Sequence, residues 1–506
     1  MALDDFTLAD VYRRNAALAP RRTAFVFEGR HISHLDYLGR VTRLAAGLAR
    51  EGVTAGDRVA ILSQNALEMV DLIGAEAYIG AVLLPVNVRL SAEEIGFVLA
   101  DGAPLLLIVG RDYQPIAQTL APSLPSLRRC FGLGADAAPF QPFGELYDVD
   151  DPAPRQDVDA DAGFVIIHTA AVGGRPRGAL LSQRNLLIAQ SSLIQALGLG
   201  EADVNLGVLP LFHITGLGLM LTAQQAGGVN VIAAKFDAAE AARGIAAEQV
   251  TLLATFAPML GAILEHASGD QLRSLRAVTG LDTPQTIECF EAMCPNARFW
   301  STYGQSETSG LATLSPYRER PKSAGRPLFW RSMAVVDADD RPLPEGEVGE
   351  IVLRGPTVFK GYWNNKAATA HALRGGWHHT GDLGRFDADG YLWYAGRAPE
   401  KDLIKTGGEN VYPAEVEAAI RAHPGVAEVV VIGVPDPQWS EAIKAVCVCR
   451  DGASPSAAEI ADFVAGQIAR FKRPKYVVFV ASLPLTATGA IDRAAVKVAH
   501  GEASSD

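Results

Sequence analysis

The sequence predicts an α/β protein with a large N-terminal domain of α/β subdomains, a β-rich subdomain and a smaller α+β domain at the C-terminal end. Short runs rich in β-branched residues alternate with amphipathic helical patterns through most of the chain, which is typical of α/β architecture. After about residue 332 turn signals separate the runs, which indicates a β-rich part. After residue 396 a polar stretch leads into a second set of strands and helices.

Short apolar runs in the first part of the chain are the candidate strands of the large domain. They fall at residues 58–62, 105–109, 164–168, 229–233, 252–256 and 276–279. Between them, apolar residues recur at helical spacing over residues 35–48, and Ser33 with Asp36 predicts a capping box at the start of that helix. Ser91 and Glu94 predict the start of a second helix in the same way.

The C-terminal third predicts first a β-rich part and then a small domain. Strands are expected at 334–336 and 350–353, with turn signals such as Asp339-Asp340 between them. Helices are expected to begin at Pro413 and after Ser456. The further expected strands span residues 429–434, 443–449 and 476–480. We therefore predict two domains, 1–395 and 396–506.

Length and charge limit the class of protein. A chain of 506 residues has room for roughly two to four domains. It contains 45 Lys and Arg against 57 Asp and Glu, so its formal net charge is −12. Such a chain is a poor candidate for binding nucleic acid or an anionic membrane by charge alone. A local basic site for a phosphorylated ligand remains open.

The cysteines and one apolar stretch bear on the compartment. Five cysteines, an odd number, cannot form a disulfide framework, and the N-terminus shows no apolar export signal, so we expect a cytoplasmic protein. Residues 204–234 lack Asp, Glu, Lys and Arg and are long enough to span a bilayer. Pro210 and several glycines interrupt this stretch, so we expect a buried strand–loop–helix–strand unit and no membrane span.

Several common enzyme motifs are missing. The sequence has no G-x-x-x-x-G-K-[ST] phosphate loop and no H-E-x-x-H zinc motif. Residues 304–308 resemble a serine-hydrolase nucleophile elbow but carry Thr308 where the second glycine belongs. His378 and His379 are adjacent, so they should point to opposite sides of a strand, which argues against a shared metal.

Four segments, taken in order, resemble the motifs of the adenylate-forming superfamily of acyl-CoA synthetases, aryl-CoA ligases, luciferases and peptide-synthetase adenylation domains. They are IHTAAVGGRPRG at 167–178, STYGQSET at 301–308, GEIVLRGP at 349–356 with WHHTGD at 377–382, and residues 396–417 with KTGGENVYP. The resemblance covers nearly the whole chain. It implies ATP, Mg²⁺ and CoA as cofactor and co-substrates, a small carboxylic acid as substrate, no nucleic-acid partner, and a monomer or homodimer.

The first segment resembles the family's phosphate loop, in which backbone amides can face an anion. The resemblance implies that Thr169, Gly173, Gly174 and Arg177 bind the ATP phosphates. Here Ala-Ala-Val at 170–172 replaces the family's hydroxyl and glycine positions, and Arg177 replaces a lysine. The alternative is a plain strand–helix turn.

The second segment resembles the Tyr-Gly-x-[Ser/Thr]-Glu motif. By that resemblance Glu307 is both a catalytic residue and the Mg²⁺ ligand, because a hard cation prefers carboxylate oxygen. Tyr303 would lie against adenine, with Thr302 and Gly304 beside it.

Two further positions are expected at the nucleoside. Gly280 and Asp282 would form the adenine-contacting turn. In the third segment Asp382 would accept both ribose hydroxyls, since one carboxylate can take two O–H donors.

The fourth segment resembles the hinge before a small mobile domain. Lys401 would be the hinge residue, and Arg397 would bind the ribose or phosphate. Lys405 begins a loop that would serve the thioester-forming step. Gly407 and Gly408 would line the pantetheine tunnel, where missing side chains permit close backbone approach.

Two other positions carry catalytic expectations. Phe212-His213 resembles the family's aromatic–His pair beside the acyl pocket, so His213 would line or gate that pocket; the alternative is a core histidine. Near the C-terminus Ala490 occupies the place of the family's lysine, which offsets repulsion between the substrate carboxylate and the ATP α-phosphate. Losing such a charge typically costs about a hundred- to a thousandfold. Either this is an engineered Lys-to-Ala variant, or it is a natural, nearly inactive paralogue.

Together the motifs predict an AMP-forming acyl-CoA ligase with impaired adenylation. Domain 1–395 would bind ATP and the acyl substrate, activating a fatty, aromatic or alicyclic acid as an acyl-adenylate. Domain 396–506 would then rotate about the hinge for transfer to CoA. Two alternatives remain open: a ligase that loads a carrier protein, and an inactive nucleotide- or acyl-binding paralogue.

Overall fold

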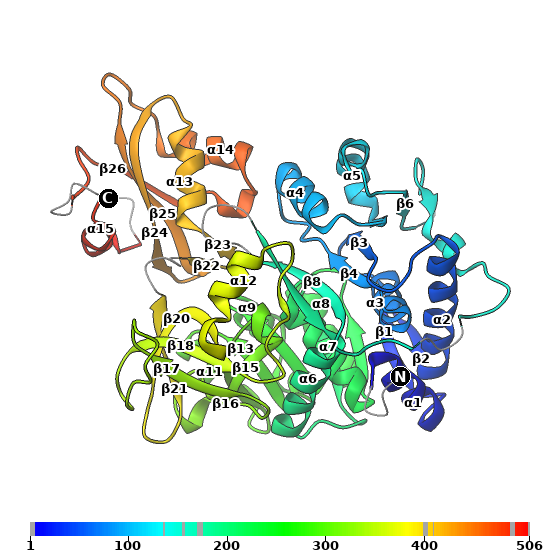
Figure 1. Cartoon of the computed structure of the whole chain (residues 1–506). Coiled ribbons are helices and arrows are strands. Elements are labelled where there is room, and N and C mark those ends of the chain that lie inside the picture. The colour runs from blue at the N-terminus through cyan, green and yellow to red at the C-terminus, as the bar shows by residue number, and fades with distance from the viewer. Residues whose placement is uncertain are drawn as a thin grey trace.

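A large N-terminal domain and a small C-terminal domain make up the mixed α/β fold, as the sequence predicts (Figure 1). The computed structural model describes residues 6–134, 137–153, 157–169, 176–397, 403–407, 409–485 and 491–503. The predicted site residues Gly173, Gly174, Lys401, Gly408 and Ala490 lie outside the described residues.

One sheet of the large domain has the strand order β19-β9-β8-β4-β3-β5-β6-β7. Its strands are β3 (Arg58–Leu62), β4 (Val82–Pro85), β5 (Leu106–Val109), β6 (Arg129–Gly132), β7 (Gln141–Pro142), β8 (Gly163–Thr169), β9 (Arg177–Ser182) and β19 (Gly361–Tyr362). Helices cover both faces, which explains why the central strands read as continuous apolar runs.

Alternate side chains of this sheet enter two different cores. Ile61 and Ile108 belong to the core with α1, α2 and α3, whereas their neighbours Leu62 and Val109 belong to the core with α4 and α5. These helices are α1 (Leu8–Leu18), α2 (His34–Arg50), α3 (Leu67–Ile79), α4 (Ala92–Gly102) and α5 (Gln114–Leu120).

The second sheet has the order β16-β15-β14-β13-β12-β10-β11-β1-β2. Its strands are β1 (Thr23–Phe27), β2 (Arg30–Ser33), β10 (Val204–Gly207), β11 (Val229–Ile232), β12 (Leu252–Phe256), β13 (Ala277–Leu281), β14 (Arg298–Gln305), β15 (Gly310–Pro316) and β16 (Arg326–Pro327). Helices α6 (Gln183–Leu197) and α7 (Ile214–Ala226) pack in the core shared with the first sheet.

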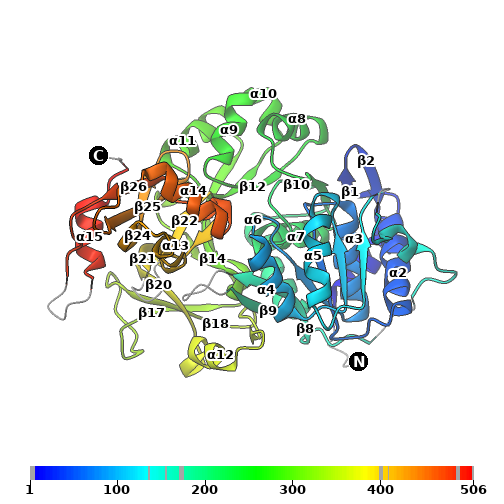
Figure 2. The ribbon, with the colours of Figure 1, turned by 90° about the horizontal axis from the view of Figure 1, so that it is seen from above.

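The outer face of the second sheet carries four helices, which Figure 2 shows together along one side of the molecule. They are α8 (Ala238–Glu248), α9 (Met259–His266), α10 (Gly269–Leu272) and α11 (Pro284–Met293). The stretch 204–234 folds as β10, α7 and β11, which confirms the predicted strand–loop–helix–strand unit. Within the described part of the chain, no helix has the length and apolarity needed to cross a membrane.

An antiparallel sheet, β17-β18-β20-β21, forms the predicted β-rich subdomain. It contains β17 (Ser332–Val336), β18 (Gly349–Arg354), β20 (His378–Phe386) and β21 (Leu392–Arg397), and α12 (Lys366–Ala372) lies beside it. Arg397 is the register partner of Asp382 in the pairing of β21 with β20, so this sheet fixes the backbone of Arg397. The boundary at residue 395 stays a prediction.

The small domain is a sheet with helices on both faces. Its strands are β22 (Ile404–Thr406), β23 (Glu409–Val411), β24 (Val426–Asp436), β25 (Ser440–Cys449) and β26 (Tyr476–Phe479). Its helices are α13 (Pro413–Arg421), α14 (Ala457–Gln467) and α15 (Arg493–His500). Helices α13 and α14 cover one face and α15 the other.

Helix starts follow the capping signals with one difference. At α4 the Ser91 hydroxyl accepts from Glu94 N at 3.3 Å and Glu94 accepts from Ser91 N at 2.7 Å, which confirms that capping box. At α2 the Ser33 hydroxyl accepts from Asp36 N at 3.1 Å, but the Asp36 carboxylate accepts from the Ser33 hydroxyl at 2.7 Å. The predicted reciprocal box at Ser33 is therefore only half formed.

Candidate active site

Most of the predicted site residues that the structure describes lie around one cavity of about 1900 Å³ between the two domains. Those on its wall are Thr169, Arg177, His213, Thr302, Tyr303, Gly304, Glu307, Asp382, Arg397, Lys405 and Gly407. A site for one small ligand typically measures about 300–1,000 Å³. The cavity therefore has room for more than one substrate at a time.

Gly280 and Asp282 are not part of that wall, although Leu281 between them is. Gly280 has φ +143°, and an added Cβ would lie 1.8 Å from the carbonyl oxygen of Thr255 on the neighbouring strand. Asp282 accepts from Thr283 N at 2.8 Å, and burial raises its pKa. Sheet packing accounts for the glycine, and contact of either residue with adenine stays a prediction.

Asp382 is the centre of a buried hydrogen-bond network. Its Oδ2 accepts from the Tyr303 hydroxyl at 2.8 Å and from Gln305 Nε2 at 2.6 Å, and its Oδ1 accepts from Arg397 Nε at 2.9 Å. Burial, followed by the Asp382 charge, raises the pKa of Tyr303 well above its ordinary value, so Tyr303 acts as a neutral donor.

Gln305 and His378, for which the sequence predicted no role at the nucleotide site, support this network. His378 Nε2 lies 3.1 Å from Gln305 Oε1, which orients the amide toward Asp382. Gln305 is the variable position of the Tyr-Gly-x-Ser-Glu motif, so the motif gave no reason to select it.

Glu307 lies on the short helical turn η4 (Ser306–Thr308) and is 8% exposed. Its Oε1 accepts from the Tyr362 hydroxyl at 2.8 Å, and its backbone oxygen accepts from Phe359 N at 2.9 Å. No hydrogen bond to Oε2 occurs among the described residues, so one oxygen remains to bind a hard cation such as Mg²⁺. The residues present fit that ion.

Tyr362 links two of the predicted ATP-binding residues. Besides donating to Glu307, its ring lies 5.6 Å from the guanidinium carbon of Arg177. Tyr362 belongs to the Gly-Tyr-Trp run at 361–363, for which the sequence predicted no individual role. The Tyr362 ring contacts the Arg177 cation and its hydroxyl contacts the Glu307 carboxylate, so both charged groups lie at the same end of the cavity.

Glu409 connects the small domain to the large one. Its carboxylate accepts from Arg89 Nη1 at 2.8 Å and from Asn87 Nδ2 at 3.3 Å, and lies 3.2 Å from His213 Nε2. Burial alone would raise the pKa of Glu409, but the charges of His213 and Arg89 outweigh it and lower the pKa to about 2. His213 is thus at the cavity wall with a third of its side chain exposed, and is not a core residue.

The loop of the small domain that begins at Lys405 enters the cavity. Lys405 Nζ lies 6.0 Å from the ring centre of Tyr394, and burial, then the charge of Arg397, lowers its pKa. Gly407 has φ +56°, and an added Cβ would lie 2.7 Å from the ring of Trp439. A side chain at residue 407 would therefore collide with the wall.

The apolar part of the wall comes from the stretch 204–234, from residues 279–305 and from segments beyond them. It includes Phe212, Ile214, Phe256, Met259, Leu281 and Leu311. Lys235, immediately after the uncharged stretch 204–234, also lines the cavity and is exposed, so a cation lies beside this apolar wall.

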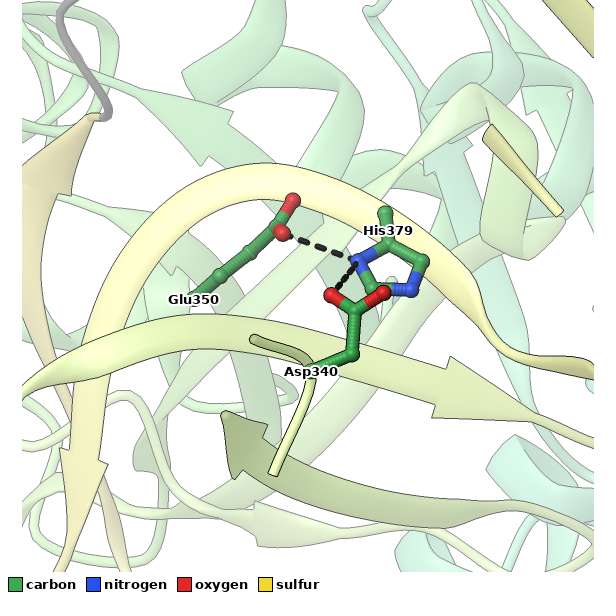
Figure 3. A group of neighbouring side chains, drawn as sticks. All are labelled: Asp340, Glu350 and His379. Atoms are coloured by element: carbon green, nitrogen blue, oxygen red, sulfur yellow. Dashed lines mark hydrogen bonds and ion pairs between the residues drawn. The ribbon is translucent and has the colours of Figure 1, made fainter. Parts of the chain in front are cut away.

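Outside the cavity, Asp340, Glu350 and His379 place possible metal-ligand atoms within 4.8 Å of one another (Figure 3). His379 Nδ1 lies 2.8 Å from Glu350 Oε2, and the Arg374 guanidinium contacts both carboxylates at 3.1 Å. Arg374 thus already supplies positive charge to this cluster. Glu350 Oε1 accepts from Gly381 N at 2.8 Å, so the cluster supports the turn that carries Asp382.

The chain belongs to the AMP-binding enzyme family, whose large-domain model matches residues 12–363 and whose C-terminal-domain model matches residues 415–490. Adenylate-forming enzymes are thus the class to which the fold and cavity correspond. Within that class its relatives are acyl- and aryl-CoA ligases. A feruloyl-CoA synthase from Amycolatopsis sp is 35% identical over 496 residues, covering 96% of this chain and 98% of that protein.

Two further relatives agree with this assignment. A 2-succinylbenzoate–CoA ligase from Geobacillus kaustophilus is 36% identical over 500 residues, covering 97% of this chain and 98% of that protein. A solved structure from Rhodopseudomonas palustris CGA009, provisionally named a long-chain-fatty-acid CoA ligase, is 69% identical with a TM-score of 0.77. It covers 78% of this chain and 100% of that one.

Proposed function

We propose that this protein activates an aromatic carboxylic acid with ATP, forming an acyl-adenylate and pyrophosphate, and then transfers the acyl group to CoA with release of AMP. The observation that carries the proposal is that one cavity brings together Glu307 and Asp382, the residues predicted to bind Mg²⁺ and the ribose, and the loop of the small domain that contains Glu409. The apolar wall offers a place for a ring, and two relatives are named for ferulate and 2-succinylbenzoate.

The residues divide the work between binding and charge stabilisation. Asp382 and Arg397 would hold the ribose, and Arg177 would face the phosphates, where Mg²⁺ held by Glu307 would neutralise developing negative charge. Asp382 already accepts three hydrogen bonds, and a carboxylate offers about four acceptor positions. Two ribose hydroxyls would therefore displace at least one protein donor.

Ala490 would weaken only the first step, because it leaves the substrate carboxylate and the ATP α-phosphate without the family's lysine. A fatty acid is the second candidate substrate, favoured by the name of the 69% identical structure. The assay is a panel of ferulate, 2-succinylbenzoate, indoleacetate, hexanoate and palmitate with ATP and CoA, using Ala490→Lys and following AMP and thioester. Turnover of the aromatic acids supports the proposal. Turnover of palmitate alone would contradict it and would identify a fatty acid as the substrate.

Two further outcomes separate the alternatives left open by the sequence. Adenylate formation without CoA-thioester would indicate a carrier protein as acceptor. ATP binding without pyrophosphate exchange in the Ala490→Lys protein would indicate a nucleotide-binding paralogue. Either result would contradict the proposed acyl-CoA ligase activity.

A further inference from the structure

Lys472 makes a buried ionic contact between the two domains. It ends the short helical turn η8 (Arg470–Lys472) of the small domain and is 4% exposed. Its Nζ donates to Glu94 on α4 of the large domain and, at 2.6 Å, to Glu415 on α13 of the small domain. A lysine so far from water is stable as a cation only when it is paired.

Contacts within the large domain hold Glu94 in place independently of the small domain. Its Oε2 accepts from Ser91 N at 2.7 Å in the capping box of α4, and its Oε1 accepts from Lys472. Burial acts to raise the pKa of Glu94, but the Lys472 charge outweighs burial and lowers it. Glu94 is therefore an ionised partner fixed by the start of a helix.

Lys472 differs from its basic neighbours. Within the segment 470–475, all of which the structure describes, Arg470, Arg473 and Lys475 are exposed while Lys472 is buried. Lys475 pairs with Asp436 of its own domain, at 2.5 Å. The charge of Lys472 is therefore paired within the protein, and one of its two partners belongs to the other domain.

We infer that the Glu94–Lys472–Glu415 bridge positions the small domain in the orientation seen here and thereby favours acyl transfer to CoA. This inference rests on the proposed two-step function. In this orientation the loop with Lys405, Gly407 and Glu409 lines the cavity, whereas Leu485 and Ile491, which flank the segment carrying Ala490, do not. Glu94 and Lys472 belong to different domains, so rotation of the small domain for adenylation would separate them.

Two variants remove the interdomain contact by different routes. Glu94→Gln keeps an amide oxygen for the capping hydrogen bond but loses the charge, and Lys472→Met removes the ammonium at similar volume. Acyl transfer from presynthesised acyl-adenylate to CoA should fall by about ten- to a hundredfold, the effect of losing a hydrogen bond to a charged group. Pyrophosphate exchange, measured in the Ala490→Lys background, should not fall.

The control is Lys444→Met. Lys444 is also a buried lysine of the small domain, 2% exposed, but it donates at 2.9 Å to the Glu502 carbonyl of the same domain. This variant should leave the ratio of the two half-reactions unchanged. If Lys472→Met slows both steps equally, or slows neither, the bridge is not a positioning element.

The orientation of the small domain relative to the large one can be measured independently of catalytic activity. Cys289 is exposed on α11 of the large domain and Asp451 lies in an exposed turn of the small domain, so spin labels at Cys289 and Asp451→Cys report the interdomain distance. The distribution should broaden toward a second distance in Lys472→Met and Glu94→Gln, but not in Lys444→Met. An unchanged distribution overturns the inference. Absence of thioester formation from presynthesised acyl-adenylate and CoA in the parent protein would instead contradict the proposed function, and the distance measurement would still test the bridge.

Discussion

Asp382 shows how much a single buried carboxylate depends on its surroundings. Three donors already surround it at 2.6–2.9 Å: Tyr303 and Gln305 on β14, and Arg397 on β21 of a different sheet. A buried acceptor with three hydrogen bonds is expensive to disturb, because any donor left unpaired loses the compensation for its desolvation. The Asp382 carboxylate is therefore held in a fixed position, and a ligand hydroxyl would have to replace one of the present donors to bind it.

Glu307→Gln should reduce the benefit that Mg²⁺ gives to ATP binding. The amide oxygen can still accept from Tyr362, but the anionic ligand for a hard cation is lost. Titration calorimetry with ATP, with and without Mg²⁺, measures this directly. The affinity for ATP without the metal should stay the same or increase, because one negative charge beside the phosphates is gone.

Tyr362→Phe is the matched control for that experiment. It keeps the Glu307 charge and removes only the 2.8 Å hydrogen bond that orients it, so the Mg²⁺ benefit should fall less than in Glu307→Gln. If Mg²⁺ strengthens ATP binding to Glu307→Gln as much as to the parent protein, Glu307 is not the metal ligand.

Glu409 should make a pH-dependent contribution to stability. Its folded-state pKa is about 2 against an ordinary 4.5, so the contribution is complete above pH 4.5 and is lost as the pH falls from 4.5 toward 2. A shift of this size corresponds to ~3 kcal/mol. Chemical denaturation of the parent and Glu409→Gln should differ by about that amount at pH 7, and the difference should shrink as the pH falls from 4.5 toward 2. A difference that does not change with pH would contradict this.

At the scale of the element, backbone packing and helix capping place the site residues. Gly304 lies where β14 and β15 approach so closely that an added Cβ would be 2.1 Å from the Gly310 carbonyl oxygen. Ser182 caps α6 directly after β9, the strand that begins with Arg177. In both cases a small residue fixes the end of an element that carries a predicted ATP contact.

Ser182→Ala should destabilise the large domain by about 1 kcal/mol, the usual cost of losing a helix N-cap. Ser182 is fully buried, accepts from Asn185 N at 3.0 Å, and donates its own N–H to Asn185 Oδ1 at 2.9 Å. Denaturant unfolding followed by circular dichroism measures the change. Ser456→Ala removes a comparable but exposed capping box from α14 and should affect the small domain only. Equal stability of Ser182→Ala and the parent would contradict the role of the cap.

At the scale of the whole molecule, the cavity exists only because two domains meet. Glu409 and Lys405 come from the small domain, whereas His213, Glu307 and Asp382 come from the large one. A site shared across a hinge can be remodelled by rotation, which lets one cavity serve two reactions in turn.

Position 490 should separate the two half-reactions. The protein as given should be nearly inactive from acid plus ATP, and Ala490→Lys should raise adenylation by about a hundred- to a thousandfold. Both forms should convert presynthesised acyl-adenylate and CoA to thioester at similar rates, because a residue that stabilises one transition state need not affect another. Stopped reactions for each step measure this. Equal slowing of both steps, or no rescue by lysine, would contradict the assignment of Ala490 to the lysine position.

Much of the fold follows from local pattern. The runs at 58–62 and 252–256 are the strands β3 and β12, and the helix expected at Pro413 begins there as α13. These features depend on side-chain periodicity and caps within a few residues, so neighbours in sequence suffice to predict them. The site was predictable to the extent that motifs name residue types: His213, Glu307 and Asp382 do meet at one cavity.

Local sequence patterns could not predict contacts between residues that are far apart in the sequence. Arg89 meets Glu409 across 320 positions, and Glu94 meets Lys472 across 378. The sequence around Glu94 indicates only that it belongs to a helix capping box. It gives no sign that the same carboxylate also binds the other domain.

The sequence by itself determined the element types and the class of chemistry, and it predicts that Ala490 stands at the family's lysine position, because each of these depends on neighbouring residues. Only the tertiary structure decided that Tyr362 orients Glu307, that Asp382 already accepts three hydrogen bonds, and that Lys472 bridges the domains. The reason is physical: a buried charge is stable only beside its partner, and chain folding, not chain order, brings that partner within hydrogen-bond distance.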